Sequence, residues 1–324
     1  MSGWSYKEQP LSFPIENGAH AGPGYEETHG FALLTKSSPL PDPRKQYLRP
    51  LDLRDAALRL LGREDEVIYP KLKSRGSTSN TLRLMTYNVH SCKGMDGHIS
   101  PERIARVISE YSPDIIALQE LDVARPRSNN VDQAHEIARL LEMDFHFHPA
   151  ISLEEELYGD AILSHLPLKL VKADVLFPPP SPWNLSSEPR GALWVELCYQ
   201  GKKVQIINTH LGLSKKERLC HIHQLLGTDW LQDKRAQGPL IFCGDFNAMP
   251  SSLEYRLLTE QLEDAQERAS NQKPKRTWFG RYPLMRIDHV FISQDIEVVA
   301  FEVPRTELTK LASDHMPLVV DLVL

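Results

Sequence analysis

The sequence predicts an α/β domain with mixed β-sheets that begins near residue 81 and continues to Leu324. Short apolar runs alternate with segments in which apolar residues recur every three or four positions. Some apolar runs follow one another closely, as hairpin strands do, whereas others are separated by a predicted helix. This alternation, combined with hairpin-like pairs, is typical of sheets that contain both parallel and antiparallel neighbours.

Three segments are predicted to be helices. Ser100 and Pro101 mark the start of the first, because serine caps a helix well and proline suits its first turn. Apolar residues at helical spacing define one face in each segment. These residues are Ile104, Val107, Ile108 and Tyr111 in the first helix, Ala134, Ile137, Ala138 and Leu141 in the second, and Leu219, Ile222, Leu226 and Trp230 in the third.

The short apolar runs are predicted to be strands, because they are bounded by polar or turn-forming residues. They cover residues 82–87, 115–118, 161–163, 192–197, 204–208, 240–243, 290–292 and 318–322. Residues 144–148 are predicted to form a half-exposed strand. No repeat of fixed period connects them, which argues against a solenoid.

Residues 1–80 differ from residues 81–324 in composition. They are rich in proline, and only residues 53–61 have a helical apolar pattern. Residues 75–80 have the composition of a linker. We predict a Pro-rich, partly ordered N-terminal extension followed by one catalytic domain. A small independent domain is the alternative, but the extension offers little apolar material for a core.

The composition restricts the class of protein. The four cysteines are scattered and form no CxxC pair, which argues against a disulfide framework and a zinc knuckle. No apolar run could span a bilayer, and the first 14 residues lack the apolar segment of a secretory signal. We therefore expect a cytoplasmic protein, with peripheral attachment at a membrane left open. A net charge of −6 is a mild argument against a nucleic-acid partner.

Polar residues cluster where the predicted strands begin or end. In open α/β sheets the loops at strand ends usually form the functional site. Carboxylate and amide oxygens are the ligands that Mg²⁺, Mn²⁺ and Ca²⁺ prefer. The segments are Thr86-Tyr87-Asn88, Gln119-Glu120, Asn208-Thr209-His210-Leu211, Gly244-Asp245-Phe246-Asn247, Ile287-Asp288-His289 and Ser313-Asp314-His315.

These six segments, in this order, resemble the motifs of the endonuclease/exonuclease/phosphatase superfamily. That superfamily includes DNase I, exonuclease III-type repair endonucleases, neutral sphingomyelinases and inositol polyphosphate 5-phosphatases. The resemblance extends from about residue 82 to residue 324. It implies a four-layered α/β/β/α sandwich with two mixed β-sheets, the DNase I-like fold.

The resemblance also implies a metal site and a water-activating group. Glu120 is similar to the principal metal ligand of the family, with Asn88 and Asp314 nearby. The implied cofactor is Mg²⁺ or Mn²⁺. Asp245 resembles the group that orients or deprotonates the attacking water, and Asn247 lies beside it in the motif.

Two histidines resemble the phosphate-facing imidazoles of the family. His315 corresponds to the one that contacts the scissile phosphate, and Asp288 to the carboxylate that fixes its tautomer. His210 resembles the second imidazole of DNase I-like members. For Asp288 and Asn247 a purely structural role is the alternative, because groups that orient such sites are common.

Two further segments suggest substrate contacts. Residues 158–164 resemble a family strand that usually has asparagine where this chain has Asp160. Residues 188–192 resemble a short motif of bacterial hydrolase-like members. Arg190 and Tyr158 are therefore candidate substrate-binding residues. The alternatives are an exposed surface arginine and a packed tyrosine ring.

The combined prediction is a divalent-metal-dependent phosphoester hydrolase. We expect a phosphodiesterase or phosphatase that acts on a phospholipid headgroup or a small organic phosphoester, because the loop 177–189 is Pro-rich, carries Trp183 and lacks basic residues before Arg190. One alternative is a nuclease acting on DNA or RNA, for which the basic tracts at 125–127 and 273–276 would follow phosphates. Another is an inactive binding module of the same fold. The sequence leaves the oligomeric state open.

Overall fold

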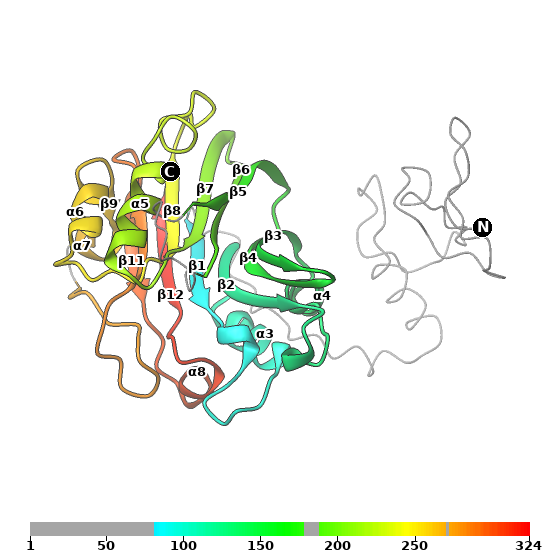
Figure 1. The fold of residues 1–324 in the computed structure, drawn as a ribbon. Coiled ribbons are helices and arrows are strands. Elements are labelled where there is room, and N and C mark those ends of the chain that lie inside the picture. Colours follow the sequence, from blue (N-terminus) through cyan, green and yellow to red (C-terminus); the bar gives the residue numbers. More distant parts are fainter. Residues whose placement is uncertain (1–80, 178–187, 270–271) are drawn as a thin grey trace, which may run out of the picture. The chain divides into compact units, whose positions relative to one another are not determined.

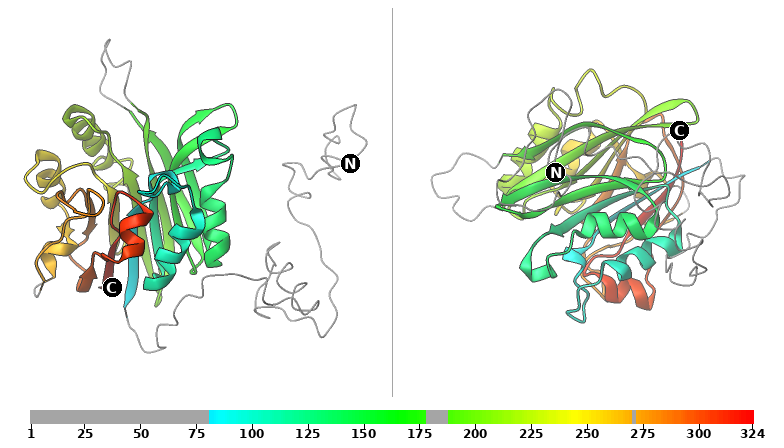
Figure 2. Two further views of the ribbon diagram at one scale, coloured as in Figure 1. Left: turned by 90° about the horizontal axis from the view of Figure 1, so that it is seen from below. Right: turned by 90° about the vertical axis from the view of Figure 1, so that its right-hand side faces the viewer.

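The structure, a computed structural model, describes residues 81–177, 188–269 and 272–324. The predicted extension over residues 1–80 and the segment around Trp183 lie outside the described residues. Two six-stranded β-sheets face each other, and helices cover their outer faces (Figures 1 and 2). The predicted α/β/β/α sandwich with two mixed sheets is confirmed.

The first sheet contains one parallel pair among antiparallel ones. Its central strands β1 and β2 are parallel, and each is antiparallel to its other neighbour. In order across the sheet its strands are β11 (Glu297–Glu302), β12 (Leu318–Val323), β1 (Leu82–Asn88), β2 (Ile115–Val123), β4 (Glu156–Ser164) and β3 (Asp144–Leu153).

The second sheet is built in the same way around the parallel pair β7 and β8. Its order is β5 (Leu168–Leu176), β6 (Arg190–Tyr199), β7 (Lys202–His210), β8 (Leu240–Asp245), β10 (Asp288–Ile292) and β9 (Glu263–Asp264). The sequence pattern missed three edge strands, β5, β9 and β11. Two of them, β5 and β11, have several exposed positions and lack a continuous apolar run, and β9 has only two residues.

Helices bury apolar faces against the outer side of each sheet. On the first sheet, α3 (Pro101–Tyr111) and α4 (Gln133–Leu141) follow the predicted pattern, and α8 (Glu307–Ala312) joins the same core. The Ser100 hydroxyl accepts a hydrogen bond from the backbone N–H of Arg103, which confirms the predicted cap. On the second sheet lie α5 (Lys215–Leu225) and α6 (Leu253–Thr259); the remaining helical turns are η2 (His90–Cys92), η3 (Pro126–Ser128) and α7 (Ala265–Arg268).

The prediction that α5 continues to Trp230 is wrong. The helix ends at Leu225, two residues before Gly227, and glycine is a poor helix former. Trp230 is nevertheless buried in the same core as Ile222, because the loop after the helix folds back over the sheet. The apolar spacing therefore predicted the burial of Trp230 correctly and the end of the helix incorrectly.

A polar clamp joins the two sheets. The amide of Asn208 on β7 donates to the carbonyl oxygens of Leu118 and Ala161, at 2.9 and 3.0 Å, on the first sheet. Its side-chain oxygen accepts from Gln119 Nε2 at 2.8 Å. Away from the cleft, the core between the sheets consists of apolar side chains. A buried amide whose donors and acceptor are all used fixes one relative position of the sheets.

The direction of the strands brings the motif residues to one edge of the sandwich. The four parallel-pair strands β1, β2, β7 and β8 end at this edge, and their antiparallel partners β12, β4, β6 and β10 begin there. Eight strand termini therefore converge, although they are spread over more than two hundred residues. Within the described ranges, none of the helices has the length and apolar character needed to cross a membrane.

Candidate active site

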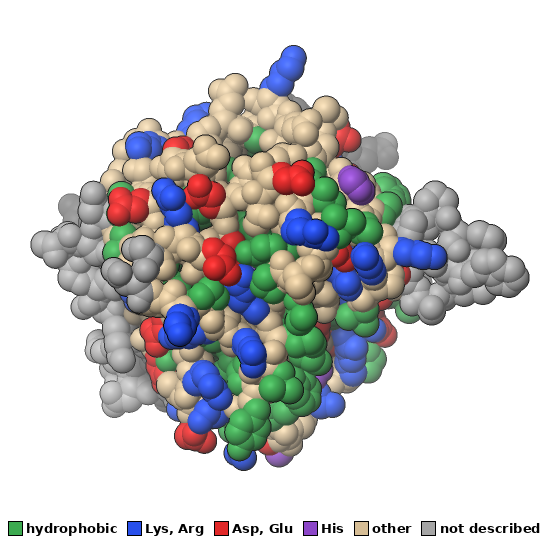
Figure 3. Space-filling view, turned by 90° about the vertical axis from the view of Figure 1, so that its left-hand side faces the viewer, with side chains coloured by type: hydrophobic (Ala, Val, Ile, Leu, Met, Phe, Trp, Pro, Cys, Tyr) green, Lys and Arg blue, Asp and Glu red, His purple; other side chains and the backbone are tan. Residues whose placement is uncertain are grey.

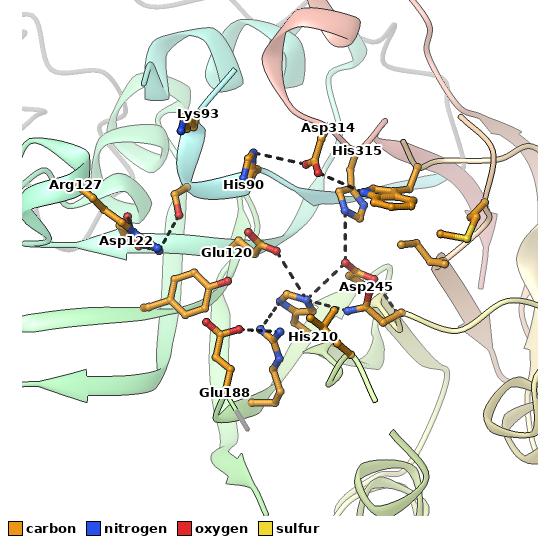
Figure 4. A pocket seen from close by; sticks show the side chains of 18 of the residues that line it. His90, Lys93, Glu120, Asp122, Arg127, Glu188, His210, Asp245, Asp314 and His315 are labelled. Atoms are coloured by element: carbon orange, nitrogen blue, oxygen red, sulfur yellow. Dashed lines mark hydrogen bonds and ion pairs between the residues drawn. The ribbon is translucent and has the colours of Figure 1, made fainter. Parts of the chain in front are cut away.

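The converging strand ends surround a cleft of about 830 Å³. Figure 4 shows acidic, basic and imidazole side chains pointing into this cleft from both sheets. Asn88 and Asp288 lie just behind its wall and contact residues that line it. The other eight predicted site residues line it: Glu120, Tyr158, Arg190, His210, Asp245, Asn247, Asp314 and His315.

A β-bulge turns Glu120 toward the cleft. The register of β2 against β4 shifts between Leu118 and Leu121, and Glu120 has a φ of 62°. This left-handed conformation is costly for a residue with a Cβ and is concentrated at functional sites. Asn88 Nδ2 donates to Glu120 Oε1 at 2.9 Å and to Asp245 Oδ2 at 3.0 Å. One amide thus holds two carboxylates from opposite sheets close together.

Gly244 allows the second carboxylate to reach this position. Its φ is 142°, and a Cβ there would lie 1.9 Å from the Thr209 carbonyl oxygen, so only glycine fits. The next residue, Asp245, is buried, and its Oδ1 accepts from the backbone N–H of Asn247 at 2.9 Å. Burial raises the pKa of Asp245, and the charge of nearby Asp288 raises it further. A raised pKa is what a carboxylate needs to accept a proton near neutral pH.

His315 lies between two carboxylates. Its Nδ1 is 3.0 Å from Asp288 Oδ2, and its Nε2 is 3.7 Å from Asp245 Oδ2. Burial opposes a charge on the imidazole, but Asp288 and then Asp245 outweigh it and raise the pKa of His315. Asp288 also accepts from the Thr277 hydroxyl, which fixes the carboxylate. At neutral pH this geometry favours an imidazolium that faces the cleft.

His210 has the opposite electrostatic environment. Burial lowers its pKa, and the positive charges of Arg190 and His315 lower it further. Its Nδ1 is 3.2 Å from Arg190 Nη1. Its Nε2 is 3.2 Å from Asn247 Nδ2. Guanidinium and amide nitrogens both donate, and a neutral imidazole accepts at one nitrogen only, so these two contacts do not select a tautomer. The same Nε2 faces Asp245 Oδ2 at 3.6 Å and Glu120 Oε1 at 3.9 Å.

Arg190 and Tyr158 are both part of the cleft wall. Arg190 is buried, so it is not an exposed surface arginine, and its Nη2 pairs with Glu188 Oε2 at 2.8 Å. Within the described residues its Nε has no hydrogen-bond partner. The ring of Tyr158 is buried beneath the guanidinium groups of Arg125 and Arg127. Tyr158 therefore packs its ring and also borders the cleft.

The structure explains why aspartate replaces asparagine at position 160. Burial raises the pKa of Asp160 to about 8, although Arg190 and a hydrogen bond from the Glu120 backbone lower it. At neutral pH its carboxyl group is therefore protonated. A protonated carboxyl group has one O–H donor and one acceptor oxygen. The carboxamide of asparagine likewise has an NH₂ donor and an acceptor oxygen. The substitution consequently adds little negative charge beside the cleft.

Asp160→Asn should therefore keep kcat/KM at pH 7 within a few-fold of wild type. It should also keep activity to higher pH, because the wild-type carboxyl ionises as pH rises through its raised pKa and then repels an anionic substrate. Steady-state kinetics from pH 6 to 10 would measure both effects, with Asp160→Ala as the variant that loses the hydrogen bond. A large loss of activity in the asparagine variant at pH 7 would contradict a neutral Asp160.

The cleft also contains residues that the sequence motifs did not identify. Trp278 Nε1 donates to Asp314 Oδ2 at 3.2 Å, and His90 Nδ1 is 3.7 Å from Asp314 Oδ1. A signal existed for Arg127, which belongs to the basic tract at 125–127, and for Trp278, which follows the tract at 273–276. The newly placed residues are His90, Ser91, Lys93, Gly97, Ile99, Asp122, Arg127, Leu213, Met249, Trp278 and Met285.

The donor set fits a hard divalent cation. Glu120 and Asp245 bring two carboxylates to one amide, and the buried negative charge of Asp245 is costly unless a proton or a cation balances it. Asp245, Asp288 and His315 also offer ligand atoms within 4.8 Å of one another. Asp288, however, is already bonded to His315 and Thr277. Glu120, with part of its carboxylate open to the cleft, is the better candidate.

An α/β/β/α sandwich with such a cleft at its strand ends defines a class of phosphoester hydrolases. The chain belongs to the Endonuclease/Exonuclease/phosphatase family, whose sequence model matches residues 85–315. Members of this family are typically phosphoester hydrolases and generally use divalent metal ions. Hydrolysis of phosphoesters is therefore the activity that family membership supports.

Individual relatives are distant. The chain is 25% identical over 252 residues to the uncharacterized protein YbhP of Escherichia coli, covering 74% of this chain and 94% of the relative. It has the fold of a mannosyl-6-phosphatase of Bacteroides thetaiotaomicron, with a TM-score of 0.61, 21% identity, and coverage of 75% of this chain and 100% of the other. The catalytic domain of human Nocturnin gives a TM-score of 0.55 at 23% identity, covering 75% and 93%.

Proposed function

We propose that this protein is a Mg²⁺- or Mn²⁺-dependent phosphodiesterase or phosphatase that acts on a phospholipid headgroup or a small organic phosphoester. The observation that carries the proposal is the mixed lining of the cleft. It contains carboxylates, imidazoles and Arg190, as phosphate chemistry requires. It also contains apolar side chains, namely Leu213, Met249, Trp278, Met285 and Ile287. A phosphoester with an organic or lipid group attached would contact both kinds of side chain.

In the proposed mechanism Asp245 holds the attacking water and accepts its proton, which its raised pKa favours. Asn247 fixes the carboxylate through its backbone N–H. Glu120, Asn88 and Asp314 would hold the metal ion. When bound, Mg²⁺ supplies positive charge that offsets the charge developing on the phosphoryl oxygens.

The two histidines take different parts in this proposal. His315, kept charged by Asp288, donates to a phosphoryl oxygen and offsets its negative charge. His210, kept neutral by burial and by the positive charges of Arg190 and His315, offers one ring N–H without a net charge. Arg190 lines the same cleft and adds a guanidinium group, whose geometry suits a phosphate.

A parallel substrate panel tests the proposal. With Mg²⁺ present, the protein should hydrolyse a chromogenic phosphodiester and at least one of sphingomyelin, phosphoinositides or nucleotide diesters. Abasic-site DNA and single-stranded DNA complete the panel, and Asp245→Asn serves as the matched inactive variant. Much faster cleavage of DNA, at rates that fall steeply as salt rises, would show a nuclease instead. Binding of a substrate without turnover of any would show an inactive binding module.

Residues 1–80 are proposed to be dispensable for catalysis, because they contain none of the motif residues. A chain that begins at Ser79 should retain the metal-dependent turnover of the full chain. The measurement is kcat on the chromogenic phosphodiester for both chains, with circular dichroism to verify folding. Loss of activity in a folded shortened chain would show that the extension contributes to the site.

A further inference from the structure

One segment beside the cleft is strongly basic. From Gln272 to Ile287 the chain has five Lys or Arg residues and no Asp or Glu, although the whole protein has a net charge of −6. The fifth, Arg286, is buried and pairs with Glu267. The other four, Lys273, Lys275, Arg276 and Arg281, are exposed. Lys273 and Lys275 border a separate pocket with Arg83 and Asp321. Arg281 lies nearer the cleft wall, and its carbonyl accepts a hydrogen bond from the exposed Arg305, so these two arginines place positive charge together.

The same segment exposes large apolar side chains. Phe279, Tyr282 and Leu284 are 48%, 76% and 68% exposed on a tight turn in which Tyr282 N–H donates to the Phe279 carbonyl. Met95, 44% exposed, lies against this turn, since a Cβ on Gly280 would be 3.2 Å from its methyl carbon. We call Met95, Phe279, Tyr282 and Leu284 the apolar rim. Figure 3 shows hydrophobic side chains gathered low on the face it views, with Lys and Arg side chains near them.

The apolar rim is connected to the cleft wall by short backbone links. Trp278 and Met285, which line the cleft, pair with each other at the base of the turn. The backbone N–H of Gly280 donates to the carbonyl of Asp314 at 2.6 Å. A surface that binds the apolar rim therefore lies next to the mouth of the cleft.

We infer that the apolar rim docks this protein on the surface of an anionic phospholipid bilayer. Aromatic and leucine side chains insert at the boundary between headgroups and acyl chains, and adjacent cations are attracted to anionic lipid. A single-stranded nucleic acid would stack on the rings of Phe279 and Tyr282 but would leave the aliphatic side chains of Leu284 and Met95 in water, whereas a bilayer buries all four. The inference rests on the proposed function for its purpose, which is to bring the cleft to lipid headgroups.

Vesicle co-sedimentation of the full chain tests this inference without requiring catalysis. With EDTA present, the protein should bind vesicles of phosphatidylcholine and phosphatidylserine more strongly than vesicles of phosphatidylcholine alone. The double variant Tyr282→Ser/Leu284→Ser should reduce the partition coefficient by roughly tenfold or more, since two exposed side chains lose their burial in lipid. Arg281→Gln/Arg305→Gln should lower binding roughly tenfold, on anionic vesicles only.

The matched control is Leu170→Ser. Leu170 is an exposed apolar residue on β5, far along the strand from Leu176, which pairs with Arg190 at the cleft. Leu170→Ser should leave vesicle binding unchanged. All of these variants should hydrolyse a soluble phosphodiester at the wild-type rate. Wild-type vesicle binding by the Tyr282/Leu284 variant would overturn the inference. Two other results would also overturn it. One is a wild-type dimer that the Tyr282/Leu284 variant no longer forms. The other is that this variant loses binding to a single-stranded oligonucleotide but keeps binding to vesicles.

The two proposals fail separately. Turnover of a soluble phosphodiester without vesicle binding would overturn the inference and leave the proposed function intact. Vesicle binding that depends on the apolar rim, in a protein that hydrolyses no phosphoester, would support the inference and overturn the proposed function.

Discussion

Replacing Asp245 with asparagine should lower kcat by roughly 10²–10⁴-fold, the usual scale for a group that transfers a proton or stabilises charge. Asparagine keeps the size of the side chain and the hydrogen bond from the Asn247 N–H, but it cannot accept a proton from water. The measurement is steady-state kcat with saturating Mg²⁺. Asp233→Asn, which alters a surface carboxylate paired with Arg235, is the matched control.

His315→Ala should reduce kcat over the same range, roughly 10²–10⁴-fold. The wild type should also lose activity as pH rises through the raised pKa of His315, because the imidazolium is present only below it. When both proteins carry Asp160→Asn, which removes the ionisation of Asp160, that alkaline loss should be absent from the residual activity of His315→Ala. Near-wild-type kcat in either folded variant, verified by circular dichroism, would refute the role proposed for that residue.

Removal of divalent metal should abolish activity, and Mg²⁺ or Mn²⁺ should restore it. Because a ligand that binds only the folded state stabilises it, Mg²⁺ should also raise the Tm of the wild type. Glu120→Gln should weaken both the recovery of activity by Mg²⁺ and the rise in Tm, since glutamine keeps the shape of the ligand and removes its charge. Glu155→Gln, at an exposed glutamate, is the control. Full activity after exhaustive EDTA treatment would exclude a metal-dependent reaction.

The sequence alone predicted the fold class and the identity of the residues at the strand ends. Apolar runs and helical spacing are local features, because each depends on residues only a few positions apart. They located the central strands and the start of α3 correctly, since these elements bury continuous apolar faces. They missed β5 and β11, whose exposed positions carry no such pattern.

Tertiary structure decided how these residues act on one another. The convergence of Asn88, Glu120 and Asp245 depends on strand direction, sheet order and a bulge in β2, which arise from packing between segments far apart in the chain. The opposite pKa shifts of His210 and His315 depend on which charged group each buried ring meets. Neither relation is encoded in nearby sequence, because desolvation and Coulomb interactions depend on distance in space.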